Sequence, residues 1–150
     1  MRLLSCLAVL SLVACAAPSS EATSSDEYTE DARVRFTTGS WEPTWSGALH
    51  GGHHVQIDYD FDRLPQCRNQ GRLVSWVVEV SWQFDDGPIT TVALPGSPGS
   101  ATVLPDSGIA IPEGKHQLAM WFQNRAVGGY DDCAAWDSRY GANYVHAIQD

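Results

Sequence analysis

Aromatic, amide and carboxylate side chains are concentrated near the end of the sequence, from Ala135 to Tyr144. An aromatic ring offers a flat apolar surface, and amides or carboxylates bond hydroxyls, so the segment suits a hydroxyl-rich ligand such as a glycan. We expect the ligand contacts to come from Trp136, Asp137, Tyr140, Asn143 and Tyr144. The alternative is that these residues only close one end of a folded domain. Three tryptophans elsewhere are candidates for the same surface: Trp41, Trp45 and Trp121.

Carboxylates lie close to the same segment, and calcium prefers such hard oxygen ligands. Asp131, Asp132 and Asp137 are the candidate ligands if calcium binds. Their spacing is not that of an EF-hand loop, and a solvent-exposed acidic loop is the simpler interpretation. Glycosidases also use a pair of carboxyl groups, one as acid and one as base or nucleophile. The sequence does not identify such a pair, and it contains no other catalytic motif. We therefore predict no enzyme activity and no required cofactor.

Histidines at positions 50, 53 and 54 raise the question of a zinc site. His53 and His54 are adjacent where a strand is expected to begin, so their side chains should point to opposite faces. No acidic or thiol ligand stands at a spacing typical of zinc sites. A solvated turn is the preferred interpretation.

The charge balance excludes one class of partner. The chain has 18 acidic against 9 basic residues and a formal charge of −9. Proteins that bind nucleic acid carry a basic surface, so we expect no nucleic-acid partner.

The four cysteines divide by position. Cys6 and Cys15 belong to the apolar N-terminus, and Cys67 and Cys133 lie in the remainder. Outside the cytoplasm the second pair predicts one disulfide. A metal site or a reactive thiol stays open as an alternative, although neither cysteine has a neighbouring histidine or Cys-x-x-Cys spacing.

Residues 1–14 predict a signal peptide, because an apolar segment too short to span a bilayer follows Arg2. Leu12-Val13-Ala14-Cys15 then resembles the lipobox of bacterial lipoproteins. The resemblance implies that Cys15 carries lipid after cleavage, so that the membrane is a partner. Ala16 is not Asp, which by resemblance to Gram-negative lipoproteins implies the outer membrane. Plain secretion after cleavage at Ala16 is the alternative.

The rest of the chain predicts a tether and one folded domain. Residues 15–30 are rich in Ser, Thr, Glu and Ala, which predicts a flexible tether, and residues 31–150 form the domain. Period-two alternation predicts strands, and residues 124–141 read as a loop. With about seven to eight strands, the fold class is all-β, an antiparallel β-sandwich of immunoglobulin-like topology. The clearest strands are 33–37, 45–49, 55–61, 73–84 and 117–123.

The segment from Trp136 to Tyr144 resembles the W-D-N-N-x-G-x-N-Y motif near the end of starch- and glycogen-binding β-sandwich modules. In those modules the Asn amides bond sugar hydroxyls and nearby aromatic rings stack on the pyranose. Here Ser138 and Arg139 replace the two Asn residues. The resemblance covers nine residues and implies the fold and a glycan ligand.

A broader resemblance covers about residues 33–148. The segment from Tyr59 to Arg68, together with the segment that begins at Trp136, is similar to an uncharacterised family of small exported β-domains frequent among myxobacterial lipoproteins. This resemblance implies a fold and a location but no activity. Taken together, the sequence predicts a lipid-anchored, non-catalytic binding domain of the cell envelope with a glycan as ligand. A structural or protein-interaction domain of the envelope is the alternative.

Overall fold

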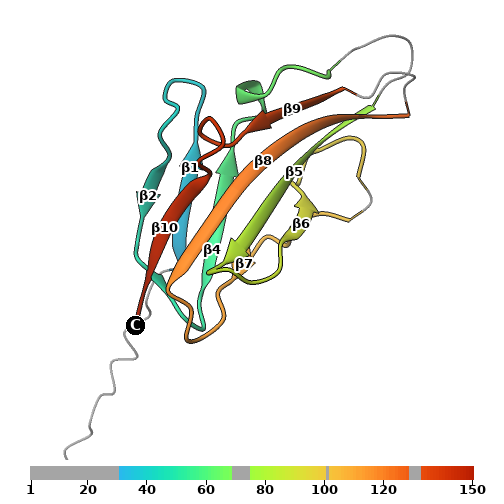
Figure 1. Ribbon diagram of the computed structural model, residues 1–150. Helices are drawn as coiled ribbons and strands as arrows, with labels where there is room; N and C mark the ends of the chain where they lie inside the picture. The colour runs from blue at the N-terminus through green and yellow to red at the C-terminus, as the bar shows by residue number, and fades with distance from the viewer. Residues whose placement is uncertain (1–30, 69–74, 101, 129–132) are drawn as a thin grey trace, which may run out of the picture.

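The computed structural model describes residues 31–68, 75–100, 102–128 and 133–150. These residues form two β-sheets packed face to face, as Figure 1 shows. Their one helical element is the short 3-10 turn η1, Phe61–Arg63. Within this part of the chain no helix is long and apolar enough to cross a membrane. The predicted signal peptide (1–14) and tether (15–30) lie outside the described residues.

The smaller sheet has four strands in the order β2-β1-β4-β7. Its edge strand β2 pairs with β1, and β7 pairs with only two residues of β4, His54 and Val55. The remaining length of that edge of β4 has no partner strand among the described residues. The bounds are β1 Ala32–Phe36, β2 Thr44–Ser46, β4 His54–Tyr59 and β7 Ile109–Ala110.

The larger sheet has six strands, with β3-β10-β8-β5-β6 in order and β9 also paired with β8. The long antiparallel pair β5 and β8 forms its centre. β9 and β10 lie one after the other along the same edge of β8. The bounds are β3 Leu49–His50, β5 Ser75–Phe84, β6 Thr90–Ala93, β8 Gln117–Val127, β9 Ala134–Asp137 and β10 Tyr144–Gln149.

Side chains from the inner faces of both sheets make one apolar core, as alternation along each strand predicts. Phe36 of β1 lies at its centre, with its ring centroid 4.6 Å from Phe122 of β8 and 4.9 Å from Tyr144 of β10. Residues that are completely buried come from both layers: Val34, Phe36, Val55, Val78, Val80, Leu118, Met120 and Phe122.

The prediction of an all-β sandwich is confirmed, but the prediction of purely antiparallel pairing is wrong. β1 pairs with β4 in parallel, and so do β3 and β10. The physical reason is the connection between them, because a parallel pair needs a crossover rather than a hairpin. After β2 the chain crosses to the larger sheet as the two-residue strand β3, and then returns to the opposite edge of β1 as β4.

Two strand boundaries also differ from the sequence prediction. The expected strand 45–49 is divided at Gly47, whose φ of 72° breaks the extended backbone, and its halves belong to different sheets. The expected loop 124–141 contains the end of β8 and the whole of β9. β9 pairs over Ala134–Asp137 because β8 extends far enough to receive it beyond β10.

Cys67 and Cys133 form a disulfide across a sequence separation of 66, with Cα atoms 5.4 Å apart. The bond joins the segment that follows η1 to the start of β9. Asn124 of β8 reinforces this junction, because its buried amide donates to the carbonyls of Leu64 and Gln66. The predicted pairing therefore fastens a loop of the smaller sheet to the larger sheet.

Replacing both Cys67 and Cys133 with Ser should lower the free energy of unfolding by about 4 kcal/mol at most, because the unfolded chain regains the entropy of a long loop. Urea denaturation of the double variant measures the loss. The matched control is the wild-type protein under reducing conditions, which should unfold at the same urea concentration as the variant. A change below about 1 kcal/mol would contradict the assignment.

Candidate functional site

Three exposed aromatic side chains surround a pocket at the end of the sandwich where η1 and the 138–143 turn lie. Trp41 is 62% exposed, Trp136 57% and Tyr140 fully exposed. The pocket measures about 460 Å³, and Asp137 and Tyr144 line it together with these rings. Because soluble proteins seldom leave several large rings in the solvent around one hollow, this aromatic pocket is the candidate site.

Strand alternation explains why Trp136 is exposed and its neighbour Asp137 is not. Trp136 lies opposite Gln123 on the outer face of β8, whereas Asp137 lies opposite the buried Phe122. A single residue therefore separates a ligand-accessible ring from a carboxylate in the interior.

Trp41 packs against Arg63, whose guanidinium lies 5.1 Å from the centroid of the Trp41 ring. The contact is a cation-π interaction on one face of the indole. Arg63 also donates to the backbone carbonyls of Thr37 at 2.7 Å, Ser40, and Trp41 at 3.2 Å. One side chain thus fixes both the ring and the loop that carries it.

The charge of Arg63 is balanced by Asp137. Nε of Arg63 donates to Oδ2 of Asp137 at 2.8 Å, and the two side chains are each only 1% exposed. Burying two charges is costly unless the geometry is good and the remaining lone pairs are satisfied. Here Tyr59 donates to Oδ2 of Asp137 at 2.9 Å, and the hydroxyl of Tyr144 donates to Oδ1. The four residues form one network between the two sheets.

The network shifts the pKa of three of its members. Burial, followed by the charge of Asp137 and the hydrogen bond to it, raises the pKa of Tyr59 far above its usual range. Burial and the hydrogen bond to Asp137 do the same to the pKa of Tyr144. Burial opposes the charge of Arg63, but the hydrogen bond and attraction to Asp137 outweigh it and raise its pKa. Near neutral pH the two tyrosines therefore stay neutral and Arg63 stays charged.

The turn that presents Tyr140 has an uncommon backbone. Arg139, Tyr140 and Asn143 have φ values of 50°, 58° and 57°, in the left-handed region that side chains disfavour. The turn is closed by the amides of Gly141 and Asn143, which donate to the carbonyl of Ser138 at 3.0 and 2.8 Å. Such backbone persists where the surroundings enforce it, and here β9 and β10 hold both ends.

A surface ion pair borders the pocket. Nη2 of Arg139 lies 3.0 Å from Oε1 of Glu42, and both side chains are more than half exposed. The pair joins the Trp41 loop to the turn that carries Tyr140. Its donors and acceptors stand beside the aromatic rings, where they can bond hydroxyl groups of a ligand.

The structure gives the five predicted ligand residues different places. Trp136 and Tyr140 are exposed at the pocket, as a ligand contact requires. Asp137 and Tyr144 are each 2% exposed and form the floor of the pocket within the Arg63 network. Asn143 is partly buried, and its described hydrogen bond comes from its backbone amide.

The calcium candidates are not assembled in the described part of the chain. Asp131 and Asp132 lie outside the described residues, and Asp137 is occupied by Arg63 and two tyrosines. Among the described residues, no group of three potential metal ligands occurs.

Sequence reasoning missed Arg63, Glu42 and Arg139. Arg63 stands in an Asp-Arg-Leu-Pro segment that resembles any polar turn, and nothing in it signals a partner 74 positions away. One signal was present in the sequence. If Trp136 faces the solvent, alternation places Asp137 on the inner face of the same strand, where a buried carboxylate needs hydrogen-bonding partners.

The model of one protein family, described as a family of unknown function (DUF6209), matches residues 9–149. No curated protein and no solved structure matches the chain.

Replacing Arg63 with Ala should lower the free energy of unfolding by about 3 to 5 kcal/mol, because it leaves the buried Asp137 carboxylate uncompensated. Replacing Arg125 with Ala is the matched control. Arg125 also makes a bidentate pair, with Glu79 at 2.7 and 3.1 Å, but its own side chain is 44% exposed, so its loss should cost about 1 kcal/mol. Equal losses for the two variants in urea denaturation would refute the central role of Arg63.

Proposed function

We propose that this chain, which belongs to the DUF6209 family of unknown function, is a non-catalytic glycan-binding protein that acts outside the cytoplasm. The observation that carries the proposal is the aromatic pocket, with Trp41, Trp136 and Tyr140 exposed around it. The rings provide stacking surfaces for pyranoses, and the Arg139 and Glu42 side chains at the margin provide bonds to hydroxyls.

The rigidity of the pocket supports binding. A ligand loses less affinity when the groups that meet it are already ordered. Arg63 holds the Trp41 ring, β9 holds Trp136, and the closed turn at Ser138 holds Tyr140. The Trp41 ring and the backbone that carries the other two rings therefore need little ordering when a sugar arrives.

The ionisable groups favour recognition over catalysis. Asp137, the one buried carboxylate among the described residues, is neutralised by Arg63, and its lone pairs are used by Tyr59 and Tyr144. A glycosidase needs a second carboxyl group, kept protonated, at a set distance from the first. Glu42, the other carboxylate that lines the pocket, is exposed and paired with Arg139.

The similarity to starch- and glycogen-binding modules supports a glycan in particular. Ser138 and Arg139, which replace the two Asn residues of that motif, close the turn and pair with Glu42. We propose that Arg139 supplies the hydrogen bonds that the Asn amides supply in those modules.

The immunoglobulin-like topology stays a prediction, since the sheets contain parallel pairs.

A second function follows from a different observation. Beyond β7 the edge of β4 has no partner strand among the described residues, which suits a protein-interaction domain of the envelope. The two functions use different surfaces and do not exclude one another.

Replacing Trp136 with Ala should weaken binding of soluble α-glucan oligosaccharides or peptidoglycan fragments to the full chain about tenfold or more, because a stacking surface is lost. Isothermal titration calorimetry measures the binding, and quenching of tryptophan fluorescence in the wild-type protein reports it independently. Trp41→Ala and Tyr140→Ala should act in the same direction.

Ile89→Ala is the matched control for these variants. Ile89 is 59% exposed in the β5–β6 hairpin, so the substitution removes exposed apolar surface away from the pocket. The variant should bind sugars like the wild type. No response of the wild-type protein to either class of sugar at millimolar concentration would refute the glycan proposal and favour the protein-interaction alternative.

For the location, we propose that Cys15 is lipidated and that the domain is held at the outer membrane. Cys15→Ser should abolish labelling by radioactive palmitate in the producing bacterium and release the protein from the membrane fraction. Cys67→Ser is the control that should keep the label. A labelled Cys15→Ser variant would exclude the lipoprotein assignment, and an unlabelled wild type would favour secretion.

A further inference from the structure

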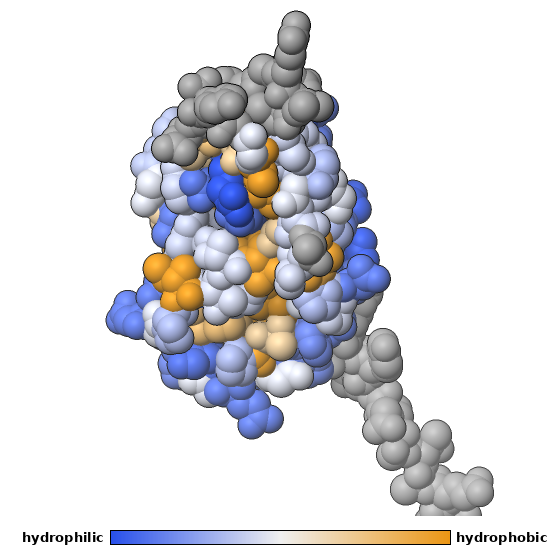
Figure 2. Space-filling view, turned by 90° about the vertical axis from the view of Figure 1, so that its right-hand side faces the viewer, coloured by the Kyte–Doolittle hydropathy of each residue, from blue (hydrophilic) through white to orange (hydrophobic). Residues whose placement is uncertain are grey.

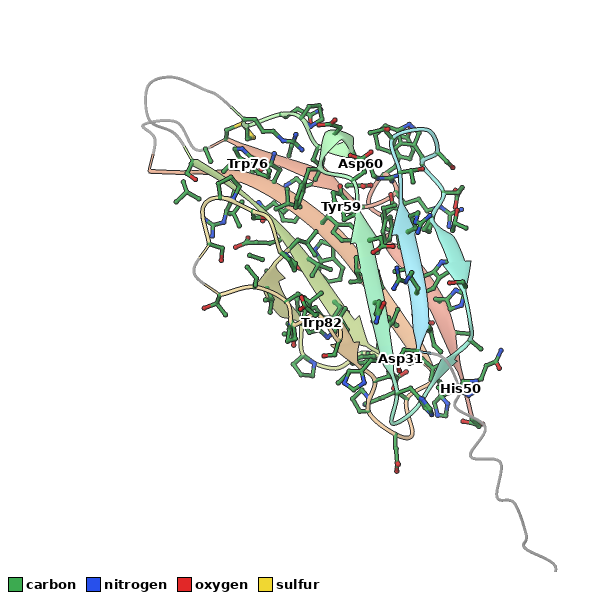
Figure 3. The ribbon with its side chains drawn as sticks, turned by 180° about the vertical axis from the view of Figure 1, so that it is seen from behind. Asp31, His50, Tyr59, Asp60, Trp76 and Trp82 are labelled. Carbon is green, nitrogen blue, oxygen red and sulfur yellow. A yellow bond between two sulfur atoms is a disulfide. The ribbon has the colours of Figure 1, made fainter. Side chains whose placement is uncertain are left out.

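The two sheets of the sandwich differ in width. The larger sheet continues past β8 to β5 and β6, whereas the smaller sheet ends in β4 and the two residues of β7. Figure 3 shows β4 in front with Tyr59 and Asp60 at its end, and Trp76 and Trp82 of β5 beyond its free edge. Figure 2 faces this side, where hydrophobic residues appear between hydrophilic margins.

The free edge carries unpaired backbone groups. Asp60 donates its amide to Phe36 of β1 at 2.9 Å, and alternate residues of a strand direct their backbone groups to the same edge. The backbone amides and carbonyls of Gln56 and Asp58 therefore point toward β1, whereas those of Ile57 and Tyr59 point away from it. β7 meets this edge only at His54 and Val55, and no other described strand pairs with it.

Beside this edge lies a furrow of about 470 Å³. Its lining combines apolar side chains with charged and polar ones: Phe36, Ile57, Tyr59, Phe61, Leu94 and Pro95 with Arg35, Thr37, Asp58 and Asp60. Ile57 and Phe61 are only half-buried although they pack against the core. The furrow shares no lining residue with the aromatic pocket. An edge with free hydrogen-bonding groups above a furrow with apolar side chains is the arrangement that accepts an added strand.

We propose that this edge binds an extended segment of a partner protein by β-strand addition, with apolar residues at alternate positions and basic residues between them. Apolar side chains would fill the furrow, and backbone bonds would form with Ile57 and Tyr59. The basic residues follow from Asp60, which comes directly after β4 and lines the furrow. Asp58 is paired with Arg33 and Arg35, but Asp60 forms no ion pair with a described residue.

Charge disfavours the two other occupants. Antiparallel pairing of β4 with β4 of a second copy, with Tyr59 opposite Tyr59, would set Asp60 against Asp58, and like charges directly opposite destabilise a sheet. The chain's own residues 18–30 contain four acidic residues, Glu21, Asp26, Glu27 and Glu30, and lack alternating apolar side chains. With a formal charge of −9, the protein as a whole attracts a basic segment.

The test uses an acetylated and amidated peptide of alternating Lys and Val, with lysine at both ends and three valines. In antiparallel pairing, a valine whose side chain faces the furrow also directs its backbone amide to β4. N-methylation of the three valines removes these donors, so it should weaken binding to the full chain at least tenfold. The matched peptide, N-methylated at its inner lysines, keeps the same charge and should bind within about threefold of the parent. Calorimetry on the unmodified protein gives the comparison.

Two protein variants locate the site. Ile57→Lys places a charge in the furrow and should weaken binding of the parent peptide at least tenfold. Ser46→Lys adds the same charge on β2, at the opposite edge of the same sheet, and should leave the affinity within about threefold. Circular dichroism shows whether Ile57→Lys folds, and the methylated peptides test the proposal without it.

Four results would overturn the proposal. The first two are that the parent peptide does not bind, and that both methylated peptides bind equally. The third is a dimer in sedimentation that Ile57→Lys dissociates, because the occupant would then be a second copy. The fourth is that deletion of residues 18–30 strengthens peptide binding more than tenfold, because the chain's own segment would then occupy the edge.

Discussion

The buried ion pair between Arg63 and Asp137 is the interaction on which the rest of the molecule depends. It joins the turn after β4 to the end of β9, and through the tyrosines it connects both sheets. A charge pair so deeply buried is tolerated only because nearly every donor and acceptor has a partner. The same guanidinium orders the Trp41 loop, so the stability of the fold and the shape of the aromatic pocket have one source.

The parts of the fold that follow from local pattern were predictable. Alternation in 55–61 and 73–84 predicted two strands, and the cysteine count predicted the disulfide. Parallel pairing of β1 and β4 was not predictable, because it depends on a crossing made by the two residues of β3. β9 was missed because a four-residue strand becomes stable only through the edge that β8 offers.

The candidate site divides in the same way. The identity of Trp136 and Tyr140 as surface aromatics follows from a motif within ten residues. The role of Asp137 depends on a partner in a remote segment, and the free edge of β4 depends on the width of the opposite sheet. Properties that arise from a missing neighbour leave no local signal, so only the assembled sheets reveal the furrow.

The arrangement of β9 and β10 has a consequence for evolution. Both strands lie end to end along β8, so the six residues between them are an outward excursion from a continuous edge. Their length and chemistry can change without altering the register of either strand, since the ladder on each side fixes where the excursion leaves and returns. A change of length in this excursion should therefore leave the scaffold beneath it unaltered.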